Sequence, residues 1–280
     1  MVAVVVHHRE PELLARTLAG LVGQSEPPEH VIVVDNSGDV RPVVPGSLPA
    51  SCSLVIADKN AGYGHAMNIG LRAILPGLSP DTGVLLLTHE ALLARDACAR
   101  LYQALDLPGT AITAPLLGRI EDPELTWSVG GEIDGRYCAL HLNPNESICH
   151  HEVRPSFTVD WADGAALMVR ASALQHLGVF DERFFMYFEE VELCARFRRA
   201  GWFIRLVPSA IAWQAPGNMG RRLAQRNRLL FVELSYSRRR AWSLARADLR
   251  RILKDPGGRR EAILGVADYA LRRWQVGRPR

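Results

Sequence analysis

Cysteine is scarce in this sequence, and none of it is arranged to hold a metal ion or a redox disulfide. The five cysteines are an odd number, and no two of them form a C-x-x-C pair. Such cysteines are typical of reduced thiols in the cytosol. The sequence also lacks an apolar run near the roughly 20 residues that cross a bilayer. A signal peptide begins with a basic segment before its apolar stretch, and here no basic segment precedes the first apolar stretch. We therefore expect a cytoplasmic protein.

Two nucleotide-binding patterns are missing as well. The segment 60–70 (NAGYGHAMNIG) contains glycines that let the backbone approach a ligand closely. It lacks the third glycine and the preceding strand register of the dinucleotide fingerprint, which excludes a Rossmann dehydrogenase. No glycine-rich loop with Arg or Lys follows the first apolar run, and this argues against a nucleotidyltransferase that grips a triphosphate.

The charge is divided unevenly along the chain. The net charge is only +3 over 280 residues, but the segment 219–280 carries 17 Arg and Lys against 5 Asp and Glu, a net charge of +12. The first 218 residues therefore carry a net charge of −9. Such a split indicates an acidic body and a basic tail that meets an anionic partner. The whole composition, 48% hydrophobic and 22% charged, is that of a soluble globular protein.

Short apolar runs separated by amphipathic segments predict alternating strands and helices. Val2–Val6 is a continuous β-branched run, typical of a strand that is buried on both faces. Leucines at i+4 spacing predict a helix from Pro11 to Gln24, and Val31–Val34 reads as a second strand. Strand, helix and strand form a parallel βαβ unit. We also expect strands at 54–56, 84–87, 111–114, 165–169 and 203–207, and a β-rich excursion at 118–157. Helices are expected after the glycine loop and through Leu75, at 96–105, from 189 to 201, and beyond 220.

Acidic residues gather near the ends of these strands. Asp35, Glu90, Asp163 and Glu190 each lie at a strand's carboxyl end or in the loop beside it. The carboxyl ends of parallel strands meet at one edge of the sheet, where ligands bind in open α/β folds. A single such acid is usually a cap or turn residue, but four of them together with a glycine loop predict one cleft.

The densest acidic segment, Phe180–Arg196, permits two interpretations. In the first, Glu189, Glu190 and Glu192 form the acidic first turn of a helix, where unpaired backbone N–H groups favour negative charge. In the second, the neighbouring aromatic rings partly desolvate one glutamate and raise its pKa, as a general base requires.

Taken in order, these segments resemble the inverting GT-A glycosyltransferases of family 2, especially the rhamnosyltransferase-like members, over residues 2–235. The matching positions are Glu12-Leu13-Leu14, Leu18, Leu21, Gln24, Val31 to Ser37 with Asp39, Asn60, Gly62, Asn68, Gly70, Val84 to Leu87, Trp161 to Gly164, Gly178, Phe180-Asp181-Glu182, Phe184-Phe185, Glu189-Glu190 and Gly201-Trp202. The resemblance implies an α/β, Rossmann-like GT-A fold with a mostly parallel central sheet and a helical C-terminal extension. It implies a catalytic domain at 1–218, with a nucleotide-binding half to about 115 and an acceptor-binding half from about 116, followed by a basic extension at 219–280.

The resemblance also implies roles for individual residues. Glu190, or Glu189 if the register slips, would take the proton from an acceptor hydroxyl that attacks the anomeric carbon of a nucleotide diphosphate sugar. One base suffices for such a single displacement, which inverts the anomeric centre, whereas glycosidases use two carboxylates. Glu90 would hold Mg²⁺ or Mn²⁺ at the diphosphate. The expected nucleotide-sugar ligands are His7, Arg9, Asp35, Ser37, Asn60, Gly62, Asn68, Thr88 and His89, and the expected acceptor ligands are Trp161, Asp163 and Gly164.

Four positions depart from the family pattern. The first strand leads into His7-His8-Arg9 instead of Thr-Tyr-Asn, and the metal motif Asp-x-Asp reads Thr88-His89-Glu90. Gln214 stands where the family often has a histidine, and an amide is a weaker metal ligand than imidazole. Glu190 replaces the usual aspartate. One carboxylate and two phosphates are a sparse set of oxygen ligands for a divalent cation, so the sequence leaves the need for a metal open.

The basic tail permits two interpretations. Its arginines are interspersed with apolar residues, as in basic amphipathic helices. They either form a solvated face on helices packed against the catalytic domain, or they bind an anionic membrane surface that carries a lipid-linked acceptor. Near such a surface each basic residue contributes about 1 kcal/mol. Nucleic acid is not an expected partner, because neither a reading helix nor an aromatic stacking platform is present.

The expected partners are a dTDP-, UDP- or GDP-linked sugar and a hydroxyl-bearing acceptor in the synthesis of a cell-surface polysaccharide or a natural product. Two alternatives remain: a nucleotide-sugar-binding protein whose eroded metal motif has cost it catalysis, and a nucleotidyltransferase of similar fold. The sequence does not determine the sugar, the nucleobase, the acceptor or the oligomeric state, for which a homodimer is one option.

Overall fold

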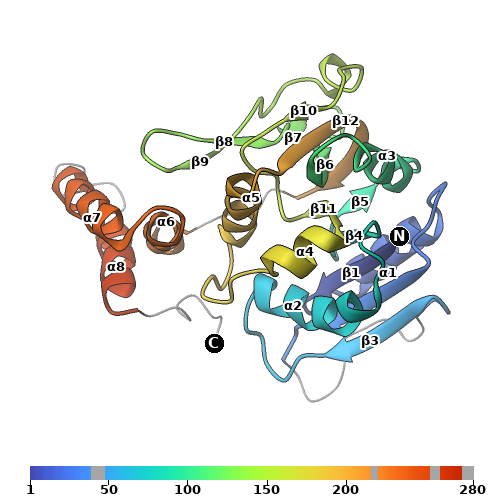
Figure 1. The fold of residues 1–280 in the computed structure, drawn as a ribbon, viewed down its shortest axis with the longest axis horizontal. Coiled ribbons are helices and arrows are strands. Elements are labelled where there is room, and N and C mark those ends of the chain that lie inside the picture. Colours follow the sequence, from blue (N-terminus) through green and yellow to red (C-terminus); the bar gives the residue numbers. More distant parts are fainter. Residues whose placement is uncertain (39–47, 216–219, 253–258, 273–280) are drawn as a thin grey trace.

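The computed structural model describes residues 1–38, 48–215, 220–252 and 259–272, and its centre is a ten-stranded mixed sheet with helices on both faces (Figure 1). The strands are β1 (Val2–His7), β2 (His30–Asp35), β3 (Cys52–Ile56), β4 (Gly83–Thr88), β5 (Leu92–Leu93), β6 (Thr110–Arg119), β7 (Thr126–Ser128), β8 (Gly131–Ile133), β9 (Ala139–His141), β10 (Phe157–Thr158), β11 (Ala166–Arg170) and β12 (Phe203–Gln214). The α-helices are α1 (Pro11–Val22), α2 (Tyr63–Ile74), α3 (Ala97–Ala104), α4 (Ala171–Leu177), α5 (Glu189–Arg199), α6 (Arg221–Ser235), α7 (Arg238–Ile252) and α8 (Arg259–Ala270). Two short 3₁₀ helices lie at Leu75–Gly77 and Ile148–His150.

The main path of the sheet has the strand order β10-β12-β6-β11-β4-β1-β2-β3. The four strands β3, β2, β1 and β4 are parallel, and β6 runs parallel to β12. β11 is antiparallel to both of its neighbours, β4 and β6. The predicted α/β fold with a mostly parallel central sheet and C-terminal helices is thus confirmed. The two parallel groups run in the same direction, and β11 lies between them and runs in the opposite direction.

The reversal of β11 corrects the expected setting of Asp163. The sequence pattern put this acid near a strand's carboxyl end, but it precedes the amino end of β11. Because β11 runs against β4, its beginning lies beside the end of β4. Ala166 pairs with Leu87, and the backbone N–H of Thr88 donates to the carbonyl of Ala165 (3.0 Å). Asp163 therefore reaches the predicted edge of the sheet from the opposite chain direction.

Strands β6 and β12 are longer than the apolar runs that predicted them. The runs at 111–114 and 203–207 mark only the first part of each strand, because the pairing of β12 with β6 shifts register between Val207 and Ile211. Such a bulge interrupts the apolar pattern without ending the strand. Beyond it, β12 continues to Gln214.

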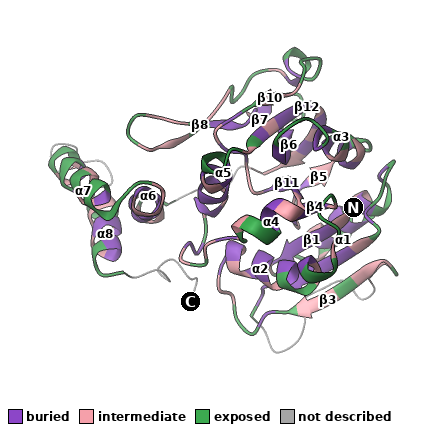
Figure 2. Ribbon diagram, in the orientation of Figure 1, coloured by how far each residue is buried: buried purple, intermediate pink, exposed green. Residues whose placement is uncertain are grey.

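Helices cover both faces of the sheet, and its central strands are mostly buried (Figure 2). The alternating strand side chains divide into two cores. On one face, Val4 and Leu86 pack with residues of α2, α4 and α5. On the other face, Val5 and Leu87 pack with residues of α1 and α3. The β-branched run of β1 is therefore buried on both faces, as predicted.

The basic tail forms α6, α7 and α8 at one end of the molecule, where α6 lies beside α5 (Figure 1). Helix α6 packs against α5, α7 and α8, and its Leu229, Leu230 and Phe231 are buried. The expected domain boundary at 218 falls in residues 216–219, and Asp39 of the matched motif falls in 39–47; both lie outside the described ranges. Within those ranges, no helix combines the length and the apolar composition needed to cross a bilayer.

The arginines of this tail fall into two groups. Arg226 and Arg228 of α6 are buried, and Arg228 pairs with the buried Asp248 of α7. Arg222 of α6 pairs through Nε with Oδ2 of Asp268 on α8 (2.5 Å). Helix α7 instead exposes six arginines, at positions 238, 239, 240, 246, 250 and 251. One group therefore holds the helices together, and the other forms a positively charged surface.

Candidate active site

A cleft of about 760 Å³ opens at the edge of the sheet where β1, β2 and β4 end and β11 begins. It is lined by nine of the predicted site residues: Asn60, Thr88, His89, Glu90, Trp161, Asp163, Gly164, Glu189 and Glu190. The other predicted residues, His7, Arg9, Asp35, Ser37, Gly62 and Asn68, do not line it. Several lining residues were not among the predicted site residues, namely His8, Asn36, Tyr63, Trp127, His141, Tyr187 and Gln214. Of these, His8, Asn36 and Gln214 entered the sequence-based expectations only as members of family motifs or as departures from them.

Two adjacent glutamates begin helix α5 at the wall of this cleft. Glu189 is buried and Glu190 is half-buried. Burial raises the pKa of Glu189 to about 7, although backbone N–H groups and the charge of Arg226 oppose the shift. Burial also raises the pKa of Glu190 well above its usual range, and the charges of Glu189 and then Asp163 add to this effect. The pair therefore retains protons at a pH where exposed glutamates have lost theirs.

The loop in front of these glutamates has an unusual backbone. Tyr187 and Phe188 have φ angles of +71° and +72°, and neither is a glycine. Left-handed conformations of bulky residues cost on the order of 1–3 kcal/mol each and persist only where the surroundings enforce them. Phe188 is the residue that caps α5, so this conformation sets the direction in which Glu189 and Glu190 leave the loop.

The glycine loop before α2 touches the loop before α5. Gly62 has φ +102°, and a Cβ placed on it would lie 1.9 Å from the carbonyl oxygen of Phe185. The next residue, Tyr63, donates its backbone N–H to that same carbonyl (3.0 Å) and its hydroxyl to the carbonyl of Gly164. Burial and the charges of Glu189 and Glu190 raise the pKa of Tyr63. Gly62 thus acts through close backbone approach to the loop before α5, and Tyr63 is a link that sequence reasoning missed.

The ends of β1 and β4 form a histidine-rich wall. His7 is buried and meets the ring of His89 edge-on, with ring centroids 5.1 Å apart, whereas His8 faces the cleft. Burial lowers the pKa of His89 to about 4, and the neighbouring His7 adds to this effect. His89 is therefore neutral at neutral pH. Strand alternation turns His8, not the predicted His7, toward the cleft.

A network of polar side chains follows β2. Asp35 is buried and its Oδ1 accepts the backbone N–H of Ser37 (3.0 Å), while Ser37 Oγ accepts the backbone N–H of Arg9 (3.0 Å). Asn36 donates from Nδ2 to Oδ1 of Asn60 (3.1 Å), and that same oxygen accepts the N–H of Gly62 (3.1 Å). Asp35 and Ser37 thus support the turn, and Asn36 and Asn60 are the members of the network that reach the cleft.

Asn68 lies on α2, outside the cleft. Its side chain is buried, donates to the carbonyl of Phe180 (2.9 Å) and to Oε1 of Glu182 (3.0 Å), and accepts the N–H of Phe180 (3.0 Å). These contacts occupy both halves of the amide. Asn68 therefore ties α2 to the start of the acidic segment instead of facing a ligand.

A second, aromatic part of the cleft lining comes mainly from the short strands of the 118–157 excursion. The ring of His141 on β9 lies between two tryptophans, with centroids 4.8 Å from Trp127 and 5.0 Å from Trp161. His141 Nδ1 is 3.6 Å from Oδ1 of Asp163. Trp161 itself is buried and donates from Nε1 to the carbonyl of Glu132 (3.2 Å). Trp127, His141 and Asp163 are therefore the more exposed members of this wall, and of these three only Asp163 was predicted.

Several buried oxygen atoms in the cleft have no hydrogen-bond partner among the described residues. They include Thr88 Oγ1 at the end of β4, Gln214 Oε1 at the end of β12, Asn36 Oδ1 and Glu189 Oε2. Glu90 also lines the cleft, and burial and then the charge of Glu10 raise its pKa. Hydroxyl, amide and carboxylate oxygens suit Mg²⁺ or Mn²⁺, provided that phosphate oxygens complete the set. Within the described ranges no three His, Cys, Asp or Glu side chains are arranged to hold a metal ion alone.

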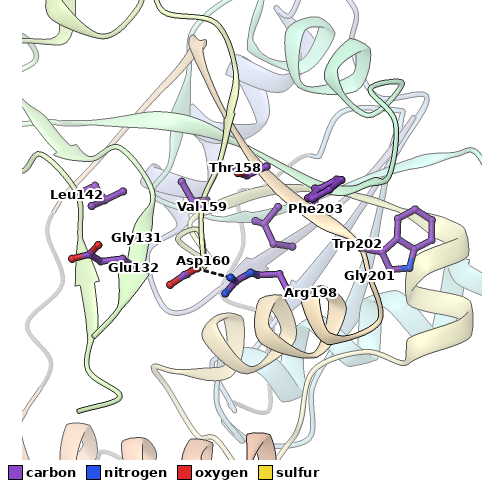
Figure 3. A pocket seen from close by; sticks show the side chains of 11 residues that line it. Gly131, Glu132, Leu142, Thr158, Val159, Asp160, Arg198, Gly201, Trp202 and Phe203 are labelled. Carbon is purple, nitrogen blue, oxygen red and sulfur yellow. Dashed lines mark ion pairs between the residues drawn. The ribbon is translucent and has the colours of Figure 1, made fainter. Parts of the chain in front are cut away.

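A second cavity, of about 520 Å³, lies beside the carboxyl end of α5 (Figure 3). Arg198 of α5 crosses it to Asp160, with Nη2 and Oδ1 2.7 Å apart, and Asp160 Oδ2 also accepts the N–H of Ile133 (2.9 Å). Both charges are therefore satisfied within the protein. None of the predicted site residues lines this cavity, so the cleft at the sheet edge remains the candidate site.

Known proteins resemble this chain in sequence and in fold. Residues 84–255 match the model of the family described as glycosyl transferase family group 2. A galactofuranosyltransferase of Mycobacterium tuberculosis, GlfT1, is 31% identical over 206 residues, which cover 71% of this chain and 64% of the relative. An N-acetylglucosaminyl-diphospho-decaprenol L-rhamnosyltransferase of the same organism is 32% identical over 218 residues, 70% of each chain. The chain thus spans less than two thirds of the length of the first of these relatives.

Solved structures show the same fold at low sequence identity. GalNAc-T7 with UDP, GalNAc and Mn²⁺ superposes with a TM-score of 0.66 at 14% identity, over 98% of this chain and 53% of the other. The mannosyltransferase PcManGT from Pyrobaculum calidifontis, in complex with GDP-Man and Mn²⁺, superposes with a TM-score of 0.56 at 14% identity, over 99% of this chain and 87% of the other. The predicted GT-A fold is therefore confirmed.

Proposed function

This chain belongs to glycosyl transferase family group 2, and we propose that it transfers a sugar from a nucleotide diphosphate sugar to an acceptor hydroxyl with inversion. Glu190 is the proposed general base. The observation that carries the proposal is the pair Glu189–Glu190, which stands at the wall of the cleft with both pKa values raised. A carboxylate with a raised pKa is basic enough to remove the hydroxyl proton as the acceptor attacks.

The donor is proposed to bind between the histidine wall and the glycine loop. Asn36 and Asn60 offer amide groups to the nucleotide or its sugar, and the backbone at Gly62 keeps this loop against the loop before α5. A divalent cation is proposed to bind at Glu90 with Thr88 Oγ1 and Gln214 Oε1, where it would neutralise the charge of the leaving diphosphate. The two solved neighbours contain Mn²⁺ with UDP or GDP-Man.

A panel of dTDP-, UDP- and GDP-linked sugars tests this function. We expect one nucleotide to raise the melting temperature, more so with Mn²⁺, and slow hydrolysis of its sugar conjugate in the absence of acceptor. Glu90→Gln is expected to abolish the additional shift from Mn²⁺ and to keep the shift from nucleotide alone, because it removes the one anionic ligand. Binding without hydrolysis or transfer for every donor would favour the non-catalytic alternative, and full activity in EDTA would refute the metal site.

The acceptor is proposed to be a lipid-linked saccharide at a membrane surface. Trp127, His141 and Asp163 offer ring faces and a carboxylate of the kind that bind sugars. The rim of the cleft is apolar at Met186, which is 38% exposed, and at Leu223 of α6. Helix α7, which packs against α6, exposes its six arginines, and the rhamnosyltransferase relative is named for a diphospho-decaprenol acceptor. Apolar residues at the cleft and a cationic helix in the same C-terminal tail suit an acceptor with a lipid tail and a diphosphate head group.

Vesicle co-sedimentation tests the membrane surface. The protein is expected to pellet with anionic vesicles and not with neutral ones, and the double variant Arg246→Gln/Arg250→Gln is expected to bind about 30-fold more weakly, at roughly 1 kcal/mol per arginine. The matched control is Arg16→Gln/Arg95→Gln, which removes the same charge near α1 and α3, far from α7 (Figure 1). Failure to pellet with either lipid, or equal weakening by both pairs, would remove α7 as the membrane-binding surface.

A further inference from the structure

Helix α6 of the basic tail reaches the loop that carries the two glutamates. Asn227 on this helix is fully buried. Its Nδ2 donates to the carbonyl oxygens of Met186 (2.8 Å) and Tyr187 (2.7 Å), and its Oδ1 accepts from Nε of Arg226 (2.7 Å). Both halves of the amide are therefore in use, and its two donors hold consecutive carbonyl groups of one loop.

The carbonyl groups of this loop are held from two sides. The carbonyl of Phe185 accepts the N–H of Tyr63 at the start of α2 (3.0 Å), while the next two carbonyls accept from Asn227. The residues between these contacts and α5 are Tyr187 and Phe188, whose φ angles are both positive. The ring of Phe188 also packs 5.9 Å from that of Phe231 on α6. Contacts from α2 and α6 thus enforce a backbone conformation that non-glycine residues avoid.

We propose that Asn227 is the positioning residue for the general base: its amide fixes the 186–188 loop so that α5 begins with Glu189 and Glu190 directed at the cleft. This inference rests on the proposed function. Only a primary amide offers two N–H donors and an acceptor at one position. Aspartate lacks the donors, and serine is too short to reach both carbonyls while accepting from Arg226.

The charged and titratable groups around the glutamates come from four elements. Asp163 faces them from the turn before β11, Tyr63 from α2, Arg226 from α6 and Tyr187 from their own loop. The charge of Arg226 lowers the pKa of Glu189. A carboxylate at position 227 would therefore stand next to Arg226, weaken its effect on Glu189 and raise the pKa of the pair.

The test compares Asn227→Asp and Asn227→Ser with the wild-type full chain, using the donor identified by the nucleotide-sugar panel. We expect kcat to fall on the order of 100-fold in both variants, because small misplacements of a catalytic group have effects of this size. We expect KM for the donor to change by less than about threefold. In Asn227→Asp the acidic limb of the kcat–pH profile is also expected to move to higher pH.

Gln225→Ala is the matched control on the same helix. Gln225 donates from Nε2 to Oδ2 of Asp248 (2.8 Å) and accepts from Nη2 of Arg228 (3.2 Å), so it stabilises the contact with α7 and does not touch the loop. This variant is expected to melt at a lower temperature with wild-type kcat and pH profile. Backbone amides of 187–189 are expected to exchange hydrogen faster in the Asn227 variants and at the wild-type rate in Gln225→Ala.

The possible outcomes separate the two proposals. A wild-type protein that transfers no sugar with any donor overturns the proposed function. An active wild type with an unchanged kcat and pH profile in Asn227→Ser overturns only the role of Asn227. A crystal structure of the wild-type protein in which the Asn227 amide does not meet the carbonyls of Met186 and Tyr187 also overturns it, whether or not the variants fold.

Discussion

Glu190→Gln is expected to lower the turnover number for sugar transfer by about 100- to 10,000-fold, the range that a positioned general base contributes. The amide keeps the size and much of the polarity of the side chain but cannot accept a proton from the acceptor. Donor binding is expected to be retained, because the proposed donor contacts lie at Asn36 and Asn60, on other segments of the chain. The measurement is single-turnover transfer with saturating donor, alongside a thermal shift with the nucleotide.

Glu189→Gln provides the comparison that distinguishes the two neighbours. Glu189 is buried and its charge raises the pKa of Glu190. Removing that charge should lower the pKa of Glu190, so that the acidic limb of the kcat–pH profile moves to lower pH while substantial activity remains. If Glu190→Gln stays active and Glu189→Gln does not, the roles are reversed and Glu189 is the base.

The sign of the wild-type pH dependence follows from the same groups. A base works only when deprotonated, so transfer should increase with pH through the raised pKa of the pair. That limb is expected well above 4.5, the ordinary value for glutamate, because burial raises both pKa values and that of Glu189 reaches about 7. An acidic limb near 4.5 would contradict the buried environment of the pair.

Gly62→Ala is expected to reduce transfer on the order of 100-fold and to lower the free energy of unfolding by about 3 kcal/mol. Gly62 has φ +102° and ψ 170°, a conformation that is essentially restricted to glycine. Its new Cβ would lie 1.9 Å from the carbonyl oxygen of Phe185, and backbone has to move to relieve that contact. The movement would displace the loop that leads to Glu189 and Glu190, so activity and stability should fall together.

Chemical denaturation and the transfer assay measure both effects of this substitution. The matched control is Gly135→Ala, because a Cβ at Gly135 would meet no atom within 4 Å and its φ is not positive. We expect the control to change the free energy of unfolding by less than about 0.5 kcal/mol. A Gly62→Ala protein with wild-type stability and turnover would show that the two loops do not depend on this close approach.

The candidate site thus depends on contacts between segments that are far apart in the sequence. The loop before α5 touches Gly62 and Tyr63 before α2, and it touches Asn227 on α6. Tyr63 in turn donates to the carbonyl of Gly164 before β11. The acidic body and the basic tail therefore share one site, although their charges separate them in the sequence.

Local sequence patterns were sufficient to predict most strands and helices. The β-branched run of β1 identifies a strand because both of its faces are buried, so that every residue can be apolar. The leucine spacing of α1 identifies a helix because one residue in three to four faces a core. The acidic start of α5 was also readable, since Glu189 and Glu190 follow an aromatic segment and precede a helical pattern. Nine of the predicted residues line the cleft. The position of Glu90, Asp163 and Glu190 near strand ends was visible in the sequence pattern, whereas the other six followed from the family resemblance and the acidic segment.

The remaining features were decided by tertiary structure alone. The direction of β11 depends on its pairing with β4 and β6, which no local pattern encodes. The side chains of Asn68 and Asn227 have the same chemistry, yet one ties α2 to Phe180 and the other holds the 186–188 loop, according to which carbonyls the fold brings near them. His141 meets two tryptophans only because the 118–157 excursion folds over the sheet edge. The sequence determined which segments form strands, helices and acidic ends, whereas long-range packing decided which side chains meet there, because hydrogen bonds and burial depend on distance in space.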